Sequence, residues 1–105
     1  MKYISTRGAS PAISFEDVLL SGPAPDGGLY MPETWPQIDF RRLRGKPGLT
    51  YSTIAGTILA LFAGTPDWYP VIDRVTKEAY RKFSDPRVAP LREVGSHRWV
   101  MELFH

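Results

Sequence analysis

One stretch, Pro23–Pro32 with the sequence PAPDGGLYMP, constrains the fold more than any other part of this chain. Aspartate tolerates turn conformations and glycine reaches positive φ without steric cost, so Asp26, Gly27 and Gly28 predict a tight reversal. The prolines before the turn stiffen its approach. Residues 29–31 then favour a short strand that ends at the next proline. Most Asp-Gly-Gly turns have no chemistry attached to them, so this pattern by itself predicts a structural corner.

Helix and strand patterns lie on both sides of this turn. Residues 3–8 begin as a strand because tyrosine, isoleucine and threonine favour extended backbone. Ser14 is placed to cap a short helix, and Thr50 is placed to cap a longer one that Gly64 ends. The expected elements are strands at 3–8 and 29–31, helices at 15–21, 51–63 and 67–83, a helical turn at 39–43, and a hairpin with strands at 88–94 and 98–104. They predict an α+β fold, a small domain of about three helices with short strands and a C-terminal β-hairpin.

The spacing of apolar residues predicts which face of each helix is buried. The helix at 51–63 is apolar around most of its circumference, so we expect it to form the core. We expect the following helix to begin with Asp67 as its cap and Pro70 in its first turn. Two i,i+4 ion pairs are expected on the wet side of that helix, Asp73 with Lys77 and Glu78 with Lys82. The residues expected to be buried are Phe15, Val18 and Leu19 on the first helix and Ile72, Val75, Ala79 and Phe83, flanked by Tyr80, on the last.

The strand at 99–104 is mostly apolar, with Glu102 as its one acid, which is typical of a strand covered on both faces. A chain of 105 residues with this helix content offers little to cover it. We therefore expect two parts, a domain at 1–87 and a hairpin at 88–105 that leads into a missing larger domain. The open strand also predicts possible self-association.

Composition and charge argue against several classes of protein. The net charge of +2 is too small to imply a polyanionic partner, and the basic cluster Arg41–Lys46 has no interleaved aromatic residues for stacking on nucleic-acid bases. The absence of cysteine excludes disulfides and thiolate metal sites, which suits a cytoplasmic protein. No apolar run approaches the length of a membrane span, so we expect a soluble chain without nucleic-acid or membrane partners.

The residues that usually carry catalysis form no recognisable set. His97 and His105 have no partner at metal-ligand spacing, so no metal site is expected. A Schiff-base lysine needs a desolvated pocket, and the four lysines, Lys2, Lys46, Lys77 and Lys82, all fall in exposed terminal, loop or helix-face positions. Pattern alone therefore predicts an α+β chain without a catalytic or cofactor-binding residue of its own.

A resemblance to a known family adds to this interpretation. Four segments carry it in order: YISTRG at 3–8, ISFED at 13–17, APDGGLYMP at 24–32 and ELFH at 102–105. Together they resemble the amino-terminal domain of threonine synthase. The resemblance implies a fold-type II pyridoxal-phosphate enzyme that converts O-phospho-L-homoserine and water into L-threonine and phosphate by β,γ-replacement. The family's cofactor lysine falls beyond His105, so we expect the rest of a threonine synthase chain as partner.

The resemblance also implies candidate site residues. Ser5 and Thr6 form a hydroxyl pair beside Arg7, which is a plausible phosphate-facing group because arginine binds phosphate bidentately. The alternative is that Thr6 and Arg7 only anchor the first strand to the corner at Asp26. Two further residues, Phe104 and His105, are expected at the edge of the cofactor loop. The isolated chain is expected to be inactive and to bind no pyridoxal phosphate, and the competing hypothesis is a free-standing interaction module without enzymatic activity.

Overall fold

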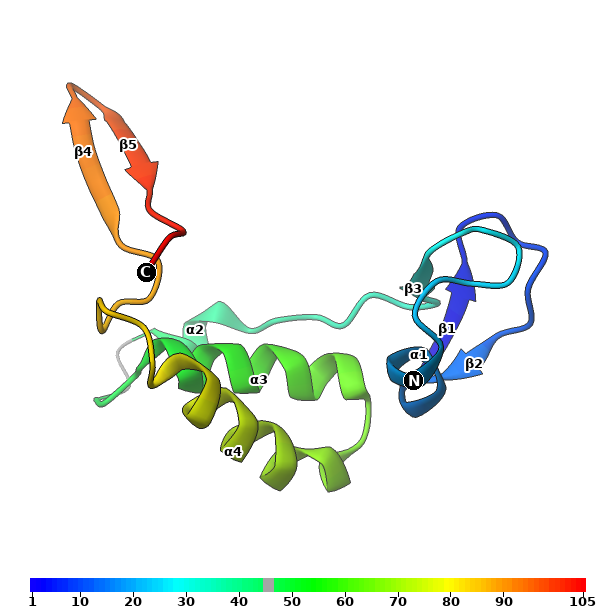
Figure 1. Ribbon diagram of the computed structural model, residues 1–105. Helices are drawn as coiled ribbons and strands as arrows, with labels where there is room; N and C mark the ends of the chain where they lie inside the picture. The colour runs from blue at the N-terminus through cyan, green and yellow to red at the C-terminus, as the bar shows by residue number, and fades with distance from the viewer. Residues whose placement is uncertain (45–46) are drawn as a thin grey trace.

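The computed structural model describes residues 1–44 and 47–105, so the predicted basic cluster lies partly outside the described residues. In chain order the elements are β1 (Lys2–Ser5), β2 (Ile13–Ser14), α1 (Phe15–Ser21), β3 (Tyr30–Pro32), α2 (Phe40–Leu43), α3 (Tyr51–Ala63), a 3₁₀ turn η1 (Pro66–Trp68), α4 (Tyr69–Tyr80), β4 (Leu91–Gly95) and β5 (Arg98–Met101). Figure 1 shows a small sheet with α1 at one end, the α3–α4 pair in the middle and the β4–β5 hairpin at the other end. This is the predicted α+β fold.

The first sheet has the strand order β2-β1-β3, and both pairings are antiparallel. In its β1–β3 pair, Ile4 lies opposite Met31. The Tyr3 hydroxyl donates to the Phe62 carbonyl of α3 at 2.7 Å, which ties the sheet to the helical pair. Phe15 contacts Tyr3 on one side and the edge of Trp68 on the other, with ring centroids 6.1 and 5.4 Å away. These contacts join two parts of the chain that are far apart in the sequence.

Helix α1 begins where the sequence predicts, because Ser14 and Asp17 form a capping box. Its predicted buried face is confirmed only in part, because Phe15 and Val18 are half-buried. The helix has no buried residue, and Leu19 at its outer side is 59% exposed. Spacing identifies the apolar side of a helix, but here Leu19 only lines a surface hollow that it shares with Leu59 of α3 and Val71 of α4.

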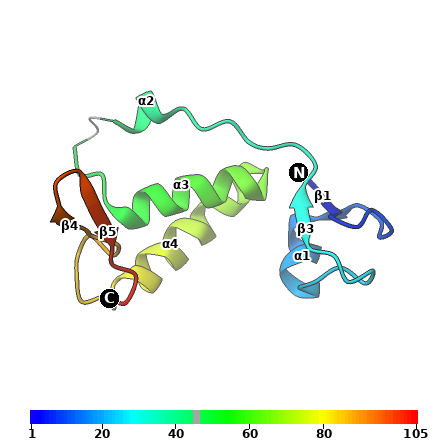
Figure 2. The ribbon, with the colours of Figure 1, turned by 90° about the horizontal axis from the view of Figure 1, so that it is seen from above.

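Helices α3 and α4 lie side by side (Figure 2), and Gly56 of α3 faces α4. A Cβ added to Gly56 would lie 3.1 Å from the Thr76 hydroxyl oxygen of α4. Thr76 is buried, and its hydroxyl donates within α4 to the Ile72 carbonyl at 2.9 Å. The prediction that α3 is packed on more than one side is confirmed in part, because α4 packs on one face and the Trp35 ring contacts Phe62 with centroids 5.9 Å apart, while Leu59 remains 44% exposed.

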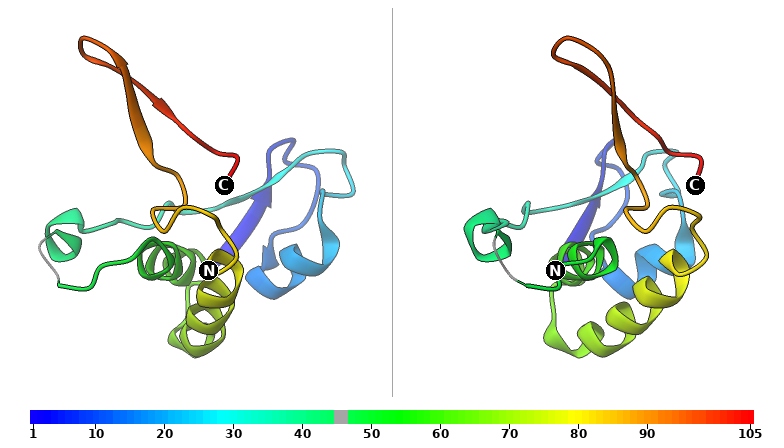
Figure 3. Two further views of the ribbon diagram at one scale, coloured as in Figure 1. Left: turned by 60° about the vertical axis from the view of Figure 1, so that its left-hand side comes forward. Right: turned by 90° about the vertical axis from the view of Figure 1, so that its left-hand side faces the viewer.

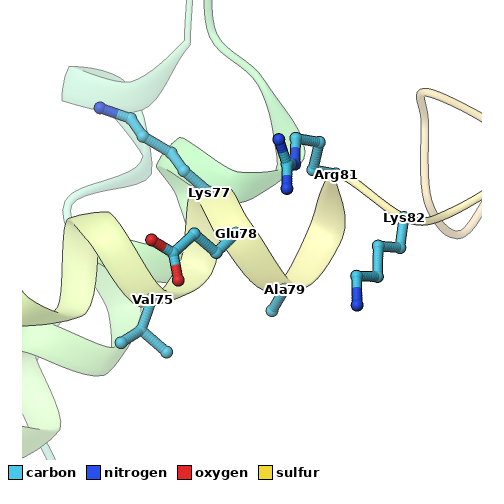
Figure 4. Close-up of a pocket in the computed structure, with 6 residues that line it drawn as sticks. All are labelled: Val75, Lys77, Glu78, Ala79, Arg81 and Lys82. Atoms are coloured by element: carbon cyan, nitrogen blue, oxygen red, sulfur yellow. The ribbon is translucent and has the colours of Figure 1, made fainter.

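The start of α4 also differs from the prediction. The chain enters the helix through the 3₁₀ turn, Trp68 occupies the cap position, and Asp67 caps nothing. The expected buried stripe is wrong beyond Ile72, because Val75 is 51% exposed and Phe83 is 36% exposed. Of the two expected ion pairs on α4, Lys77 with Asp73 forms at 2.8 Å. The second does not form among the described side chains, and Glu78 and Lys82 point apart in Figure 4.

The β4–β5 hairpin forms as predicted, with Arg92 opposite Val100 and a register irregularity between Glu93 and Gly95. His97 in its turn has a φ of +58°. The second strand ends at Met101, earlier than predicted, and every residue of both strands except Gly95 is exposed. Within the described residues, nothing covers either face of the hairpin, which stands clear of the helices in both views of Figure 3.

Candidate functional site

The corner around Asp26 is the most densely bonded polar group of the described residues. One carboxylate oxygen of Asp26 accepts from the Ser5 hydroxyl at 2.7 Å and from the Gly28 N–H at 2.9 Å. The other accepts from the Ala9 N–H at 3.0 Å. The Ser5 hydroxyl, with help from the two backbone donors, lowers the pKa of Asp26 to about 2. The charged carboxylate therefore joins β1, the loop after it and the turn before β3.

The close packing of the turn on residues 5–7 requires glycine at both Gly27 and Gly28. Gly27 has a φ of +77°, in the left-handed region that favours glycine, and a Cβ there would lie 3.0 Å from a terminal nitrogen of Arg7. A Cβ at Gly28 would collide with the Ser5 hydroxyl oxygen and lie 3.0 Å from the Thr6 hydroxyl oxygen. The turn is thus pressed directly against the Ser5-Thr6-Arg7 segment.

The structure brings Ser5, Thr6 and Arg7 together, but each of them makes different hydrogen bonds. Ser5 is 5% exposed and is committed to Asp26, while its oxygen also accepts from the Arg7 N–H at 3.2 Å. The exposed Thr6 accepts from the Leu29 N–H at 3.0 Å. Arg7 is exposed and donates from one terminal nitrogen to the Asp26 carbonyl at 3.1 Å. A guanidinium has five N–H donors, so Arg7 keeps donors for a ligand.

The two carboxy-terminal candidates lie far from this corner. Figure 1 places the C-terminus beside the hairpin, at the opposite end of the molecule from β1. Phe104 is 79% exposed, and its ring centroid lies 4.7 Å from that of His105. The described residues therefore do not form one site from all five candidates.

His105 belongs to a polar cluster that sequence reasoning missed. Its Nε2 lies 3.0 Å from one carboxylate oxygen of Glu102, and its Nδ1 lies 3.0 Å from the Ser84 hydroxyl. The other Glu102 oxygen accepts from Arg92 Nε at 2.5 Å, and Arg92 followed by His105 lowers the pKa of Glu102. The register of the hairpin could have placed Arg92 near Glu102, but no local signal links Ser84 with His105.

The cluster at His105 is a tie between two segments rather than a catalytic triad. The Ser84 N–H also donates to the His105 carbonyl at 3.3 Å, so backbone and side chain bond the same pair of residues. Ser84 is exposed, and Arg92 already neutralises the carboxylate that would assist the imidazole. The role of this cluster is therefore structural. It holds the base of the hairpin against the segment after α4.

Two hollows on the surface supply no site for a small polar ligand. The hollow in Figure 4 follows the last turns of α4, where Glu78, Lys77 and Lys82 diverge instead of converging on one point. A second hollow, between α1, α3 and α4, is lined by apolar side chains such as Leu19, Leu59 and Val71. A binding site for a small polar molecule needs convergent polar groups, which neither hollow supplies.

Across residues 1–44 and 47–105, no three histidine, aspartate or glutamate side chains are grouped so that they could hold a metal ion. In the same ranges, no helix has both the length and the apolar character needed to cross a membrane.

Comparison with known proteins gives consistent matches. A family model described as threonine synthase N terminus matches residues 2–80. A threonine synthase of Pseudomonas aeruginosa is 42% identical over 105 residues, which is all of this chain and 22% of that protein. The human protein named threonine synthase-like 2 is 38% identical over 110 residues, again with all of this chain and 22% of its own length.

A solved structure matches as well. The structure of threonine synthase from Brucella melitensis with bound PLP superimposes with a TM-score of 0.88 at 40% identity. The match covers all of this chain and 23% of the Brucella chain. The chain thus spans about a fifth of the length of the curated relatives it matches.

Proposed function

Because this chain belongs to the threonine synthase family, in the part that the family model describes as the amino terminus, we propose that it serves as the amino-terminal part of a threonine synthase. The parent enzyme converts O-phospho-L-homoserine and water into L-threonine and phosphate with pyridoxal phosphate. The superposition of the entire chain on a PLP-bound threonine synthase, at a TM-score of 0.88, is the observation that carries this proposal. We place the parent enzyme in the cytoplasm and keep the division into 1–87 and 88–105 as part of the proposal.

The described residues do not fit pyridoxal phosphate themselves. A lysine that forms a Schiff base must be deprotonated, which requires a lowered pKa. Pairing with Asp73 instead raises the pKa of Lys77. Lys2 and Lys82 are exposed, and Lys46 lies outside the described residues. We therefore assign the cofactor contacts to the remainder of the parent chain and derive no step of the reaction through the cofactor here.

Arg7 is the residue of this chain that we propose faces the substrate phosphate. Its guanidinium is exposed and is held by the Asp26 carbonyl, while Ser5 and Thr6 position the strand and the turn around it. A bidentate arginine–phosphate contact fits these free donors. Phe104 and His105 remain proposed neighbours of the active site of the parent enzyme.

The role of Arg7 is tested by steady-state kinetics of the parent enzyme. Loss of a charged hydrogen bond to the phosphate in Arg7→Gln should lower kcat/KM by roughly 10- to 100-fold. Arg7→Lys keeps the charge and should lose less. If Arg7 only anchors the corner, Arg7→Gln will lower the melting temperature and leave kcat/KM per folded enzyme unchanged.

The function itself is tested by expressing the reading frame that contains this sequence and measuring phosphate release from O-phospho-L-homoserine. Release of phosphate in step with threonine supports the proposal. An enzyme that binds pyridoxal phosphate but leaves this substrate intact would refute it.

The competing hypothesis of a free-standing module requires a closed core. Apart from proline and glycine, only five apolar residues among those described are buried: Tyr3, Ala24, Ala63, Ile72 and Val88.

A further inference from the structure

The guanidinium of Arg7 lies directly against the turn at Gly27. A Cβ on Gly27 would lie 3.0 Å from Nη1 of Arg7, 3.4 Å from Cζ and 3.9 Å from Nη2. Nη1 also donates to the carbonyl of Asp26 at 3.1 Å. The two residues beneath the arginine, Asp26 and Gly27, thus form a support for its charged end, which we name the guanidinium platform.

The platform uses only one edge of the guanidinium. The bond to the Asp26 carbonyl occupies one N–H of Nη1. Across residues 1–44 and 47–105, Nε and Nη2 of Arg7 bond to no other group, and Arg7 forms no ion pair. Nε and Nη2 form a planar fork whose geometry matches two oxygens of a phosphate. Arg7 is therefore held at one edge and open at the other.

The acid nearest to Arg7 in the corner does not neutralise it by an ion pair. Asp26 offers Arg7 its main-chain carbonyl, while its carboxylate accepts from the Ser5 hydroxyl and from the N–H groups of Gly28 and Ala9. The carboxylate of Asp26 thus holds the corner, and its carbonyl orients the arginine. A bond to a neutral carbonyl leaves the positive charge of Arg7 available to an anion.

Gly27 controls where the guanidinium lies because the atom nearest to it is the end of a flexible side chain. A separation of 3.0 Å is tight for a Cβ, so the arginine or the turn must shift when a methyl group is added. The guanidinium is exposed and can rotate away, whereas the turn is fixed by the bonds of Asp26. A methyl group at Gly27 should therefore displace Arg7 and leave the corner in place.

We propose that Gly27 is a positioning residue for phosphate recognition, which makes this inference rest on the proposed role of Arg7. Gly27 does not touch the substrate. It leaves the space in which the guanidinium lies, with Nη1 bonded to Asp26 and the Nε–Nη2 edge facing a phosphate monoester dianion. A displacement of about 1 Å weakens such a two-point contact strongly, because both N–H groups must point at phosphate oxygens.

The test compares Gly27→Ala with Gly8→Ala in the parent enzyme loaded with pyridoxal phosphate. Gly8 has a φ of +73° and Gly27 a φ of +77°, so alanine costs similar backbone strain at both positions. A Cβ at Gly8 would meet nothing within 4 Å. If Gly27 positions Arg7, Gly27→Ala should lower kcat/KM for O-phospho-L-homoserine by roughly tenfold, and Gly8→Ala by less than about twofold. Equal losses in the two variants, or no loss in Gly27→Ala, would overturn the proposal.

A double-mutant cycle shows whether this loss acts through Arg7. The guanidinium is absent in an Arg7→Gln background, so adding Gly27→Ala there should change kcat/KM per folded enzyme by less than about twofold. A full additional loss of roughly tenfold in this background would show that Gly27 acts by another route, and it would overturn the proposal.

A measurement on the wild-type enzyme does not depend on how the variants fold. Phenylglyoxal modifies accessible arginine side chains, and mass spectrometry gives the rate at Arg7 alone. The probe is inorganic phosphate, compared with chloride at equal ionic strength. If the open edge of Arg7 binds phosphate, saturating phosphate should slow its modification by about fivefold or more. Gly8→Ala should keep this protection and Gly27→Ala should lose most of it. Unchanged modification of Arg7 in the wild type would overturn the proposal.

Activity separates this proposal from the proposed function. Wild-type enzyme that releases phosphate from O-phospho-L-homoserine, with equal kcat/KM in Gly27→Ala and Gly8→Ala, refutes the positioning role and leaves the function intact. Wild-type enzyme in which phosphate protects Arg7, but which leaves O-phospho-L-homoserine unchanged, refutes the function and retains the phosphate contact.

Discussion

Asp26 shows how a single side chain can organise a corner made of three segments. Its carboxylate accepts from Ser5, Gly28 and Ala9, and its own carbonyl accepts from Arg7. Hydrogen bonds to an ionised acceptor are stronger than those between neutral groups, so the charge on Asp26 is part of the structure of the corner.

The first prediction concerns the pH dependence of this corner. The pKa of Asp26 is about 2 in the folded protein, below its ordinary value of 3.8. A lowered pKa means that the carboxylate stabilises the fold above about pH 4 and that this contribution is lost as the pH falls toward 2. In the parent enzyme, the difference in urea midpoint between wild type and Asp26→Asn should therefore be constant above about pH 5 and should shrink below pH 4. A gap that stays constant down to pH 3 would contradict this.

The second prediction concerns Gly28. A methyl group there collides with the buried Ser5 hydroxyl, so Gly28→Ala should destabilise the parent enzyme by about 1–3 kcal/mol. Gly48→Ala is the control, because Gly48 has a φ of +75° but open space around its Cβ position, so its cost is backbone strain alone. Denaturant unfolding measures both. A rescue of Gly28→Ala by Ser5→Gly would identify the collision as the cause.

At the scale of elements, the ends of helices were predictable and their covered faces were not. Thr50 and Gly64 bracket α3 in the sequence as they do in the structure, because capping depends on residues within one turn of the helix end. Burial of Val75 and Leu19 depends on a neighbour that periodicity does not reveal, and both are exposed.

The candidate site, too, could be predicted from the sequence only in part. The turn at Asp26 was expected from local turn chemistry, and anchoring of the first strand to it by Thr6 and Arg7 was the alternative to a phosphate-facing role. The collision at Gly28 and the Ser84–His105 tie were not expected, because each depends on atoms from segments that approach only in the folded chain. Sequence reasoning thus identified where segments turn and missed which side chains then touch.

The third prediction tests the cap of α3. The Thr50 hydroxyl oxygen accepts from the Thr53 N–H at 3.2 Å, so Thr50→Ala should cost about 1 kcal/mol of stability through an unsatisfied helix N–H. Thr50→Ser retains the acceptor and should stay within about 0.5 kcal/mol of wild type. Thermal or denaturant unfolding of the parent enzyme measures the difference. Equal losses in the two variants would show that the threonine methyl group, and not the cap, is what stabilises the helix.

At the scale of the whole molecule, the chain is an extended set of parts with little shared interior. The sheet with α1, the α3–α4 pair and the hairpin follow one another along a molecule whose extents are 46, 32 and 28 Å (Figure 1). Hydrophobic stabilisation scales with the apolar area removed from water, and five buried apolar residues remove little of it. We propose that the exposed strands of the hairpin let the isolated chain self-associate.

The last prediction concerns cofactor and activity in the isolated 105-residue chain. Of its four lysines, Lys2, Lys77 and Lys82 are described and exposed. None of these three lies in a desolvated pocket, and pairing with Asp73 raises the pKa of Lys77. The isolated chain should therefore show no Schiff-base absorbance with stoichiometric pyridoxal phosphate, and it should release no phosphate from O-phospho-L-homoserine. The parent enzyme, assayed in parallel, is the positive control. A visible absorbance band that borohydride bleaches onto one lysine of the isolated chain would show that these residues build a cofactor site after all.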